Sequence, residues 1–213
     1  GELARFFNKA CGIGCELLVA PLAGWTRATW IDKTWLPWVM PSPNMPTLET
    51  ATVYPGMVMF EGTQVSEGRG TTRPFEIIGA PYINPYRLAD HLNGLQLPGV
   101  HFRPTFFQPT FHKFVGQICG GVQVHILNRA SLRSFQIAVE ILKAIHAFHP
   151  DDFQWKQPPY EYVEDKLPFD VIVGNDVLRR QIEENLPWEE ISATWQDDME
   201  AFIETRRDYL LYE

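Results

Sequence analysis

The chain has 213 residues, of which 45% are hydrophobic and 13% aromatic. This composition supports one sizeable folded core, or one domain with a fragment of another, and excludes a disordered chain. The formal net charge of −8 leaves no basic stripe to neutralise phosphates, which argues against a general nucleic-acid binder.

The cysteines and histidines predict neither a cofactor nor a metal. Cys11, Cys15 and Cys119 form no two-part zinc motif, so we expect free thiols. His146 and His149 have no third ligand near them in sequence. No apolar run of eighteen residues predicts a membrane span, and no signal segment opens the chain. Because the chain opens with glycine, we expect its natural N-terminus to have been removed or to lie upstream.

The first 46 residues predict three elements in chain order. Apolar residues at helical spacing indicate a short amphipathic helix over residues 2–10, which the following glycines end. The apolar run ELLVAPLA, residues 16–23, indicates a strand. Residues 37–46 hold four prolines, so we expect a stiff extended loop there.

Two helix starts and one strand are predicted in the next part. Thr47 is suited to cap a short helical turn that runs through Thr52, and residues 56–60 then indicate a strand. The pair Asn84 and Pro85 places a cap before a proline at the first helical position, which predicts a helix ending near Gly94.

A pair of strands is predicted over residues 100–111 and 121–127, because polar and apolar residues alternate in the second of them. One face carries Val122, Val124 and Ile126, and the other carries Gln123 and His125.

The last third of the chain indicates mainly helices. The longest helical pattern begins at Ser131 and closes before Pro150. We expect a covering loop, a short buried segment and two further helices, over residues 151–168, 169–173, 176–185 and 188–209 respectively. Strands and helices do not alternate regularly, so the fold class predicted is α+β, with mixed helices and a small, largely antiparallel sheet.

The segment Glu61–Glu76 (EGTQVSEGRGTTRPFE), here called the glycine loop, differs from an ordinary core element. Its glycines permit tight backbone turns that point N–H groups and polar side chains inward, as a polar ligand requires. Arg69 and Arg73, with Arg103 further on, suit a carboxylate or phosphate. The alternative is that they pair with the loop's own glutamates and only hold the loop in place.

Five segments of the chain carry a family resemblance. They are PWVMPSPNMPTLETATVYPG, FEGTQVSEGRGTTRPFEIIGAPYI, LPGVHFRPTFFQPTF, CGGVQVHI and the closing YLLY. In this order, and over nearly the whole chain, they resemble the peptidoglycan exo-β-N-acetylmuramidase family of bacteria.

The resemblance implies a two-domain enzyme that removes terminal N-acetylmuramic acid from the non-reducing ends of peptidoglycan fragments, with its cleft between the domains. It implies that residues 1–45 are the end of a Rossmann-like α/β catalytic domain and that residues 46–213 form an α+β domain lining the cleft. The family's catalytic glutamate then lies upstream of Gly1, so the partners expected are the glycan and the missing N-terminal domain. The substrate implies an extracytoplasmic location, periplasmic or secreted.

Within this resemblance the glycine loop offers candidate site residues. Glu61 and Glu67 are candidates for a second carboxylate, with a pKa raised if a closed cleft dehydrates them; alternatively they accept hydrogen bonds from backbone N–H groups of the loop. Arg69 and Arg73 are candidates for the lactyl carboxylate of muramic acid. The hydroxyl groups suited to sugar hydroxyls or an N-acetyl group, which are also ordinary turn formers, belong to Ser66, Thr71 and Thr72.

Two candidates lie outside the loop. Asn44, in the proline-rich segment, is placed to present its amide to a sugar or to bridge loop backbone. His125, on the polar face of its strand, is placed to contact a ligand, or else to lie beneath the loop with its hydrogen bonds made within the protein.

Two other classes of function stay open. One is a non-catalytic carbohydrate-binding module that grips glycan with exposed indoles such as Trp25, Trp30, Trp35 and Trp38. The other is a phosphate- or nucleotide-binding enzyme that uses EGRGTT as an anion cradle, although the sequence has no GxxxxGK[ST] lysine.

Overall fold

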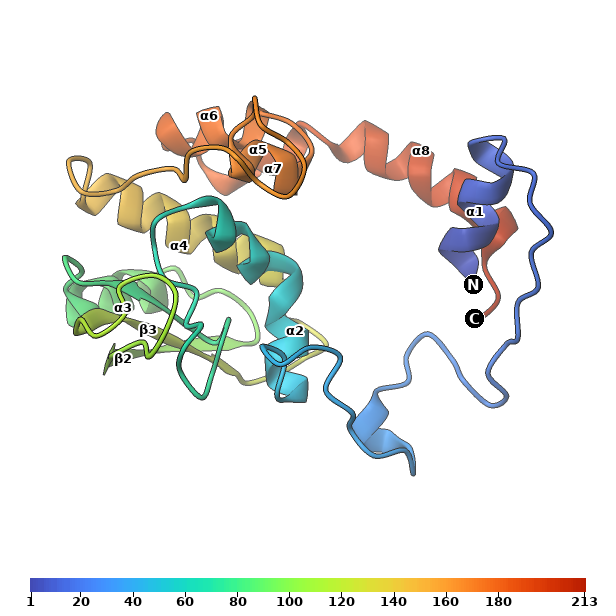
Figure 1. Ribbon diagram of the computed structural model, residues 1–213, viewed down its shortest axis with the longest axis horizontal. Coiled ribbons are helices and arrows are strands. Elements are labelled where there is room, and N and C mark those ends of the chain that lie inside the picture. The colour runs from blue at the N-terminus through green and yellow to red at the C-terminus, as the bar shows by residue number, and fades with distance from the viewer. The chain divides into compact units, whose positions relative to one another are not determined.

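A computed structural model describes all 213 residues and contains eight α-helices and one three-stranded sheet, which confirms the predicted α+β class (Figure 1). No helix has the length and apolar character needed to cross a membrane. The helices are α1 Glu2–Ala10, α2 Leu48–Met57, α3 Pro85–Gly94, α4 Ser134–Phe148, α5 Pro168–Val173, α6 Val177–Glu183, α7 Trp188–Ala193 and α8 Gln196–Arg206. The strands are β1 Ile77–Ala80, β2 Val100–Phe107 and β3 Cys119–Ile126, and the 3₁₀-helices are Ile31–Lys33, Val58–Gly62 and Arg207–Tyr209.

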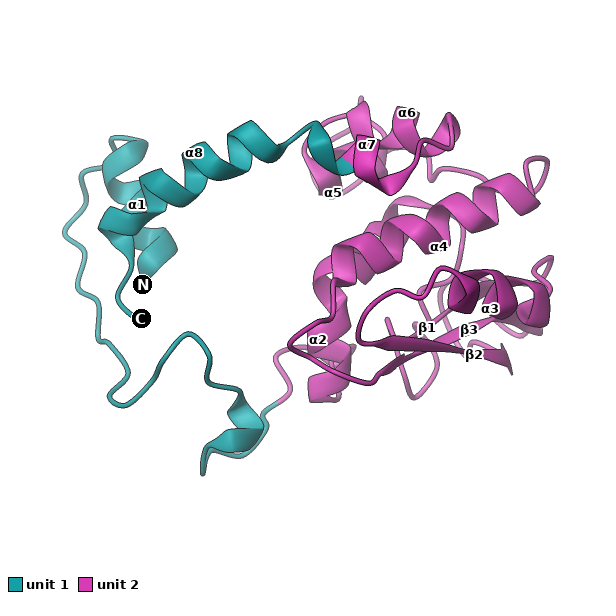
Figure 2. Ribbon diagram, turned by 180° about the vertical axis from the view of Figure 1, so that it is seen from behind, with its two compact units in different colours: residues 1–39, 192–213 teal, residues 40–191 magenta.

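Packing divides the chain into two compact units, shown in different colours in Figure 2. Unit 1 combines Gly1–Val39 with Ser192–Glu213, and unit 2 is Met40–Ile191. These units follow contacts within the chain; the predicted domain boundary after residue 45 stays a prediction.

The sheet of unit 2 has the order β1-β3-β2, and both pairs are antiparallel. Its predicted two-sided character is confirmed in β3, where Val122 and Val124 are buried while Gln123 and His125 are partly exposed. On β2, Phe102 pairs with Val124 and is buried with it. The sheet therefore has one apolar face in the core and one polar face.

Helix α4 is the centre of the core in unit 2. Ile137 and every residue from it through Ile145 are buried. The helix packs against α2, α3 and α6, and in Figure 2 it lies between the sheet with α3 on one side and α5 and α6 on the other. A helix surrounded by its neighbours in this way needs apolar residues around most of its circumference, as this sequence provides.

Helix α2 corrects the prediction of a short turn followed by a strand over residues 56–60. Thr47 caps the helix as expected, because its Oγ1 accepts a hydrogen bond from the Thr50 N–H at 3.2 Å. The helix then continues to Met57, and a 3₁₀-helix follows it. Val53, Met57 and Phe60 are all fully buried, and their i, i+4, i+7 spacing is helical, so one apolar face decides the conformation.

Three other predictions from spacing are wrong in detail. Residues 16–23 form no strand, because within this chain no other strand pairs with them. Helix α4 begins at Ser134 with Arg133 as its N-cap, not at Ser131. The predicted final helix is divided into α7 and α8. Strand β1 was not predicted, since four residues between turns give little periodicity.

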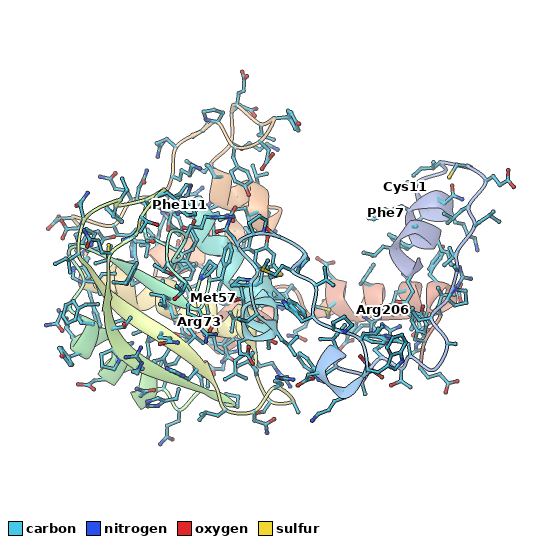
Figure 3. All side chains as sticks on the ribbon, turned by 60° about the horizontal axis from the view of Figure 1, so that its bottom comes forward. Phe7, Cys11, Met57, Arg73, Phe111 and Arg206 are labelled. Atoms are coloured by element: carbon cyan, nitrogen blue, oxygen red, sulfur yellow. The ribbon has the colours of Figure 1, made fainter.

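Unit 1 joins the two ends of the chain. The Phe6 ring of α1 meets the Tyr209 ring edge to face at 5.3 Å between centroids, and Glu2 Oε1 accepts hydrogen bonds from Leu211 N and the Arg27 guanidinium. Helix α1 nevertheless buries none of its residues; it carries Phe7 and is followed by its C-cap Cys11, both labelled in Figure 3. Both are exposed, and all three cysteines of the chain are free thiols.

We predict that Gly56→Ala lowers the free energy of unfolding by about 1–3 kcal/mol. A methyl group at Gly56 would overlap the Ser134 carbonyl oxygen, and that backbone lies where α2 meets α4. Urea denaturation checks the value, with Gly94→Ala in α3 as the matched control, because nothing lies within 4 Å of the added methyl there. A variant at Gly56 that is as stable as the control would contradict the close approach of the two helices.

Candidate functional site

The glycine loop runs from the 3₁₀-helix after α2 to strand β1 and folds back on itself. Ser66 pairs with Gly79 through two backbone hydrogen bonds of 2.8 and 3.0 Å. Gly68 and Gly70 have φ values of +78° and +82°, in the left-handed region that favours glycine. A Cβ at Gly70 would lie 2.7 Å from the carbonyl oxygen of Phe111, so the loop packs closely against residues 108–117. Phe111 and Arg73, which belong to these two neighbouring loops, are labelled in Figure 3.

A buried ion pair connects the glycine loop to the 108–117 loop. Lys113 Nζ donates hydrogen bonds to Glu67 Oε2 at 2.7 Å, to the Phe60 carbonyl at 2.8 Å and to the Val65 carbonyl at 3.0 Å. Glu67 is 0% exposed and Lys113 is nearly buried. Three oxygen acceptors match the three N–H donors of an ammonium group, so the pair is ionic although burial lowers the pKa of Lys113.

Glu67 is held in its ionised form. Burial alone would raise its pKa, but His112 and Lys113 outweigh burial and lower the pKa to about 2. His112 Nδ1 lies 3.3 Å from Oε1 without hydrogen-bond geometry, and Oε1 accepts no hydrogen bond, so we assign the larger effect to Lys113. The direction is opposite to the raised pKa that a dehydrated cleft would give, and Glu67 is accordingly unsuited to donate a proton.

Arg69 lies between the two candidate carboxylates. Its Nη2 donates to Glu61 Oε1 at 2.5 Å, and its Nε lies 3.2 Å from Glu67 Oε1. Glu61 also accepts a hydrogen bond from the Tyr160 hydroxyl at 3.1 Å, and burial together with Glu61 raises the pKa of Tyr160 to about 12. The structure thus brings Glu61, Glu67 and Arg69 together, with Glu61 the carboxylate that remains partly exposed.

Arg73 is held more weakly. Its Nη1 lies 3.5 Å from Glu76 Oε2, and its side chain is 44% exposed. Glu76 is buried and accepts hydrogen bonds from the hydroxyls of Thr50 at 2.7 Å and Thr47 at 3.0 Å. Both loop arginines therefore pair with loop glutamates, which was the alternative prediction for them.

The charges of the loop cancel. The carboxylates of Glu61, Glu67 and Glu76 are matched by Arg69, Arg73 and Lys113. A cradle for phosphate needs a surplus of positive charge, so this balance does not favour the nucleotide-binding alternative.

The hydroxyl candidates of the loop differ in their availability. Ser66 is buried and accepts a hydrogen bond from Gly68 N at 3.2 Å. Thr71 donates to the Gly68 carbonyl at 2.6 Å and accepts from Arg73 N. Thr72 is exposed. Ser66 and Thr71 thus stabilise the turn, and Thr72 is the hydroxyl that faces solvent.

The two candidates outside the loop lie apart in sequence and on different elements. Asn44 is partly buried in the proline-rich segment, where its backbone N–H donates to Ser42 Oγ at 3.4 Å. His125 lies on the polar face of β3 and accepts a hydrogen bond from Arg103 Nε at 3.4 Å. Burial and the charge of Arg103 lower the pKa of His125, so the imidazole is neutral at pH 7.

Lys113, His112 and Tyr160 also belong to the site, and no pattern in the sequence marks them. A buried glutamate requires a cation, but the sequence alone does not show that Glu67 is buried or that Lys113, 46 positions away, reaches it. No group of three or more histidine, cysteine, aspartate or glutamate side chains in the structure is arranged to hold a metal ion.

We predict that Lys113→Met lowers the free energy of unfolding by about 3–5 kcal/mol, because it removes the cation that is hydrogen-bonded to the buried Glu67 carboxylate. Denaturant unfolding at pH 7 checks this, with Lys166→Met as the control, since Lys166 is exposed. A loss at Lys113 within about 0.5 kcal/mol of the control would show that the pair does not hold the loops together.

The stability of unit 2 should also depend on pH through Glu67. The pKa of Glu67 is about 2 in the folded chain against an ordinary 4.5, so the unfolded chain takes up this proton first as the pH falls. The stabilisation that ionised Glu67 contributes is complete at a pH above the ordinary pKa. It decreases as the pH falls below that pKa and is lost when the pH falls through the pKa of the folded chain. Unfolding from pH 6 to 2.5 should show a shallower acid decline for Glu67→Gln, whereas the exposed control Glu164→Gln keeps the wild-type slope; equal slopes in all three proteins would contradict this.

Comparison with known proteins places the chain in a family. The sequence profile described as "Exo-beta-N-acetylmuramidase NamZ, C-terminal" matches residues 52–212, and the profile described as "Exo-beta-N-acetylmuramidase NamZ, N-terminal" matches residues 1–49. The peptidoglycan beta-N-acetylmuramidase NamZ of Bacillus subtilis (strain 168) is 42% identical over 212 residues, which cover 100% of this chain and 49% of the relative.

Solved structures show the same similarity. Two DUF1343 family proteins from Bacteroides fragilis NCTC 9343 match with TM-scores of 0.84 and 0.69 at 29% and 27% identity, and each match covers 100% of this chain and 55% of the solved chain. The chain thus spans about half the length of the relatives it matches. The C-terminal profile matches most of the chain, and the chain therefore belongs to the NamZ exo-beta-N-acetylmuramidase family.

Proposed function

We propose that this chain is the C-terminal part of an exo-acting glycoside hydrolase that removes non-reducing terminal N-acetylmuramic acid from peptidoglycan fragments. The observation that carries the proposal is the 42% identity to a peptidoglycan beta-N-acetylmuramidase over the whole chain. Its substrate is then cell-wall glycan, which lies outside the cytoplasmic membrane, so we propose an extracytoplasmic location.

The proposed domain arrangement places residues 1–45 at the end of a Rossmann-like catalytic domain and residues 46–213 in the domain that lines the cleft. The change from the N-terminal to the C-terminal profile between residues 49 and 52 supports this division. The missing N-terminal domain is then a required partner of the chain.

Of the two candidate carboxylates, we assign the chemical role to Glu61. Glycoside hydrolysis uses two carboxyl groups placed across the scissile bond. Glu67 is fully buried with a pKa of about 2, whereas Glu61 is partly exposed and oriented by Arg69 and Tyr160. With the second, catalytic glutamate in the upstream domain, this chain alone is inactive.

The remaining polar candidates are assigned to substrate binding. Thr72 and Arg73 are exposed on the glycine loop, and Asn44 and His125 are partly exposed elsewhere in unit 2. Ser66, Arg69 and Thr71 act through the conformation of the loop, since their polar groups are bonded within it. No cofactor enters this proposal.

A carbohydrate-binding module without catalysis is the second candidate function. A cavity of about 730 Å³ in unit 1 is lined by Trp25, Trp30 and Trp35 together with threonines. Indole faces beside hydroxyl groups suit sugar rings. A protein with this function would bind glycan without cleaving it, even when the upstream half of the protein is present.

We predict that the 213-residue chain releases no N-acetylmuramic acid from a chromogenic muramide, whereas the protein extended by its upstream half does. In the extended protein, Glu61→Gln should lower kcat by about 10²–10⁴-fold, because a positioned acid or base contributes that much. The matched control is Glu164→Gln, which alters an exposed glutamate of the 151–168 loop.

Release by the 213-residue chain itself would place the chemistry in this half. Binding without release by the extended protein would favour the carbohydrate-binding module. Retention of full activity in a folded Glu61→Gln variant would remove Glu61 from the reaction.

A further inference from the structure

We infer that Arg103, with the neighbouring His125, forms a carboxylate-binding subsite on the polar face of the sheet. We call this group the sheet-face subsite. Resting on the proposed function, we assign it to the lactyl carboxylate of N-acetylmuramic acid. Recognition of this group thereby moves from Arg69 and Arg73, which the sequence favoured, to Arg103 of β2.

The sheet register places the subsite on one surface. In the antiparallel pair of β2 and β3, Arg103 lies opposite Gln123, and His101 lies opposite His125. The residues between them, Phe102 and Val124, are buried on the opposite face. Because successive side chains of a strand alternate between faces, Arg103 and His125 share the face away from the core.

Arg103 is held in a fixed position without losing its charge. Its Nη2 donates to Gln123 Oε1 at 2.5 Å and its Nε to His125 Nε2 at 3.4 Å, and both acceptors are neutral. No carboxylate lies within ion-pair distance of Arg103, whereas Arg69 contacts two. A guanidinium has five N–H donors, so most of them stay available to an incoming acceptor.

Arg73 of the glycine loop is not part of this subsite. Arg73 is half exposed and has only the 3.5 Å contact with Glu76. Arg73 thus pairs with Glu76, which lies opposite the core residue Val124, and Arg103 is the arginine of the sheet that has no carboxylate partner.

The chemistry of the subsite selects a carboxylate. A guanidinium binds a carboxylate through two parallel N–H···O bonds, and these charged hydrogen bonds are the strong ones. N-acetylmuramic acid carries a carboxylate on its lactyl ether, and N-acetylglucosamine, otherwise the same sugar, does not. A site built around a charged group discriminates strongly against a ligand that lacks it.

The test compares two sugars on the protein extended by its upstream half. Arg103→Gln should raise KM for a chromogenic β-N-acetylmuramide by about 10- to 100-fold, as expected for a lost charged hydrogen bond, and leave any rate measured with the matching β-N-acetylglucosaminide at the wild-type level. Arg133→Gln is the control, because Arg133 is exposed and contacts only a backbone carbonyl.

A binding measurement separates this inference from the proposed function. Chemical shifts of the His125 imidazole should respond to free N-acetylmuramic acid and not to N-acetylglucosamine, and the response should disappear in Arg103→Gln. This result without any hydrolysis by the wild-type protein would overturn the proposed function and keep the subsite. Hydrolysis by the wild-type protein with an unchanged preference in Arg103→Gln, or imidazole shifts that both sugars change equally, would overturn the subsite.

Discussion

The ion pair between Lys113 and Glu67 is the interaction on which the rest of the site depends. The Lys113 ammonium group donates hydrogen bonds to a carbonyl of the 3₁₀-helix, to a carbonyl near the start of the glycine loop and to the fully buried Glu67 carboxylate. A charge this deeply buried is tolerated only when it is paired and hydrogen-bonded. The pair therefore fixes two loops against each other, and every other contact of the glycine loop is made from that fixed position.

The charges arranged around this pair have two different roles. Arg69 lies between Glu61 and Glu67, and Tyr160 completes the contacts of Glu61, so this side of the loop is a closed network that orients a single partly exposed carboxylate. Towards the sheet, the contacts become looser, and Arg73 and Arg103 keep unused donors. A closed network suits a group that must hold one geometry, and an open one suits a group that exchanges ligands. In the proposed enzyme, these are the reacting carboxylate and the substrate-binding arginines.

Local signals predicted the elements that are stabilised locally. The Asn84-Pro85 start of α3, the cap at Thr47 and the alternation in β3 follow from capping and side-chain direction, and the structure contains all three. The prediction of a strand over residues 16–23 was wrong because a strand needs a partner strand, and no local pattern shows whether one is present. The site was predictable only as a polar loop. The remaining features depend on tertiary packing between segments distant in sequence. They are the burial of Glu67, its ion pair with Lys113 and the position of Arg69 between two carboxylates.

The ionisation of Glu67 tests the account most directly, because a permanently charged Glu67 is both the anchor of the loop and the reason for assigning chemistry to Glu61. The measurement is a pH titration of the Glu67 side-chain carboxyl by ¹³C NMR in the folded chain. This carbon should show no titration near the ordinary pKa of 4.5, because the pKa of the Glu67 carboxyl lies at about 2. A pKa at or above 4.5 would contradict it, since Glu67 would then be free to carry a proton and the ion pair with Lys113 would not hold the loop.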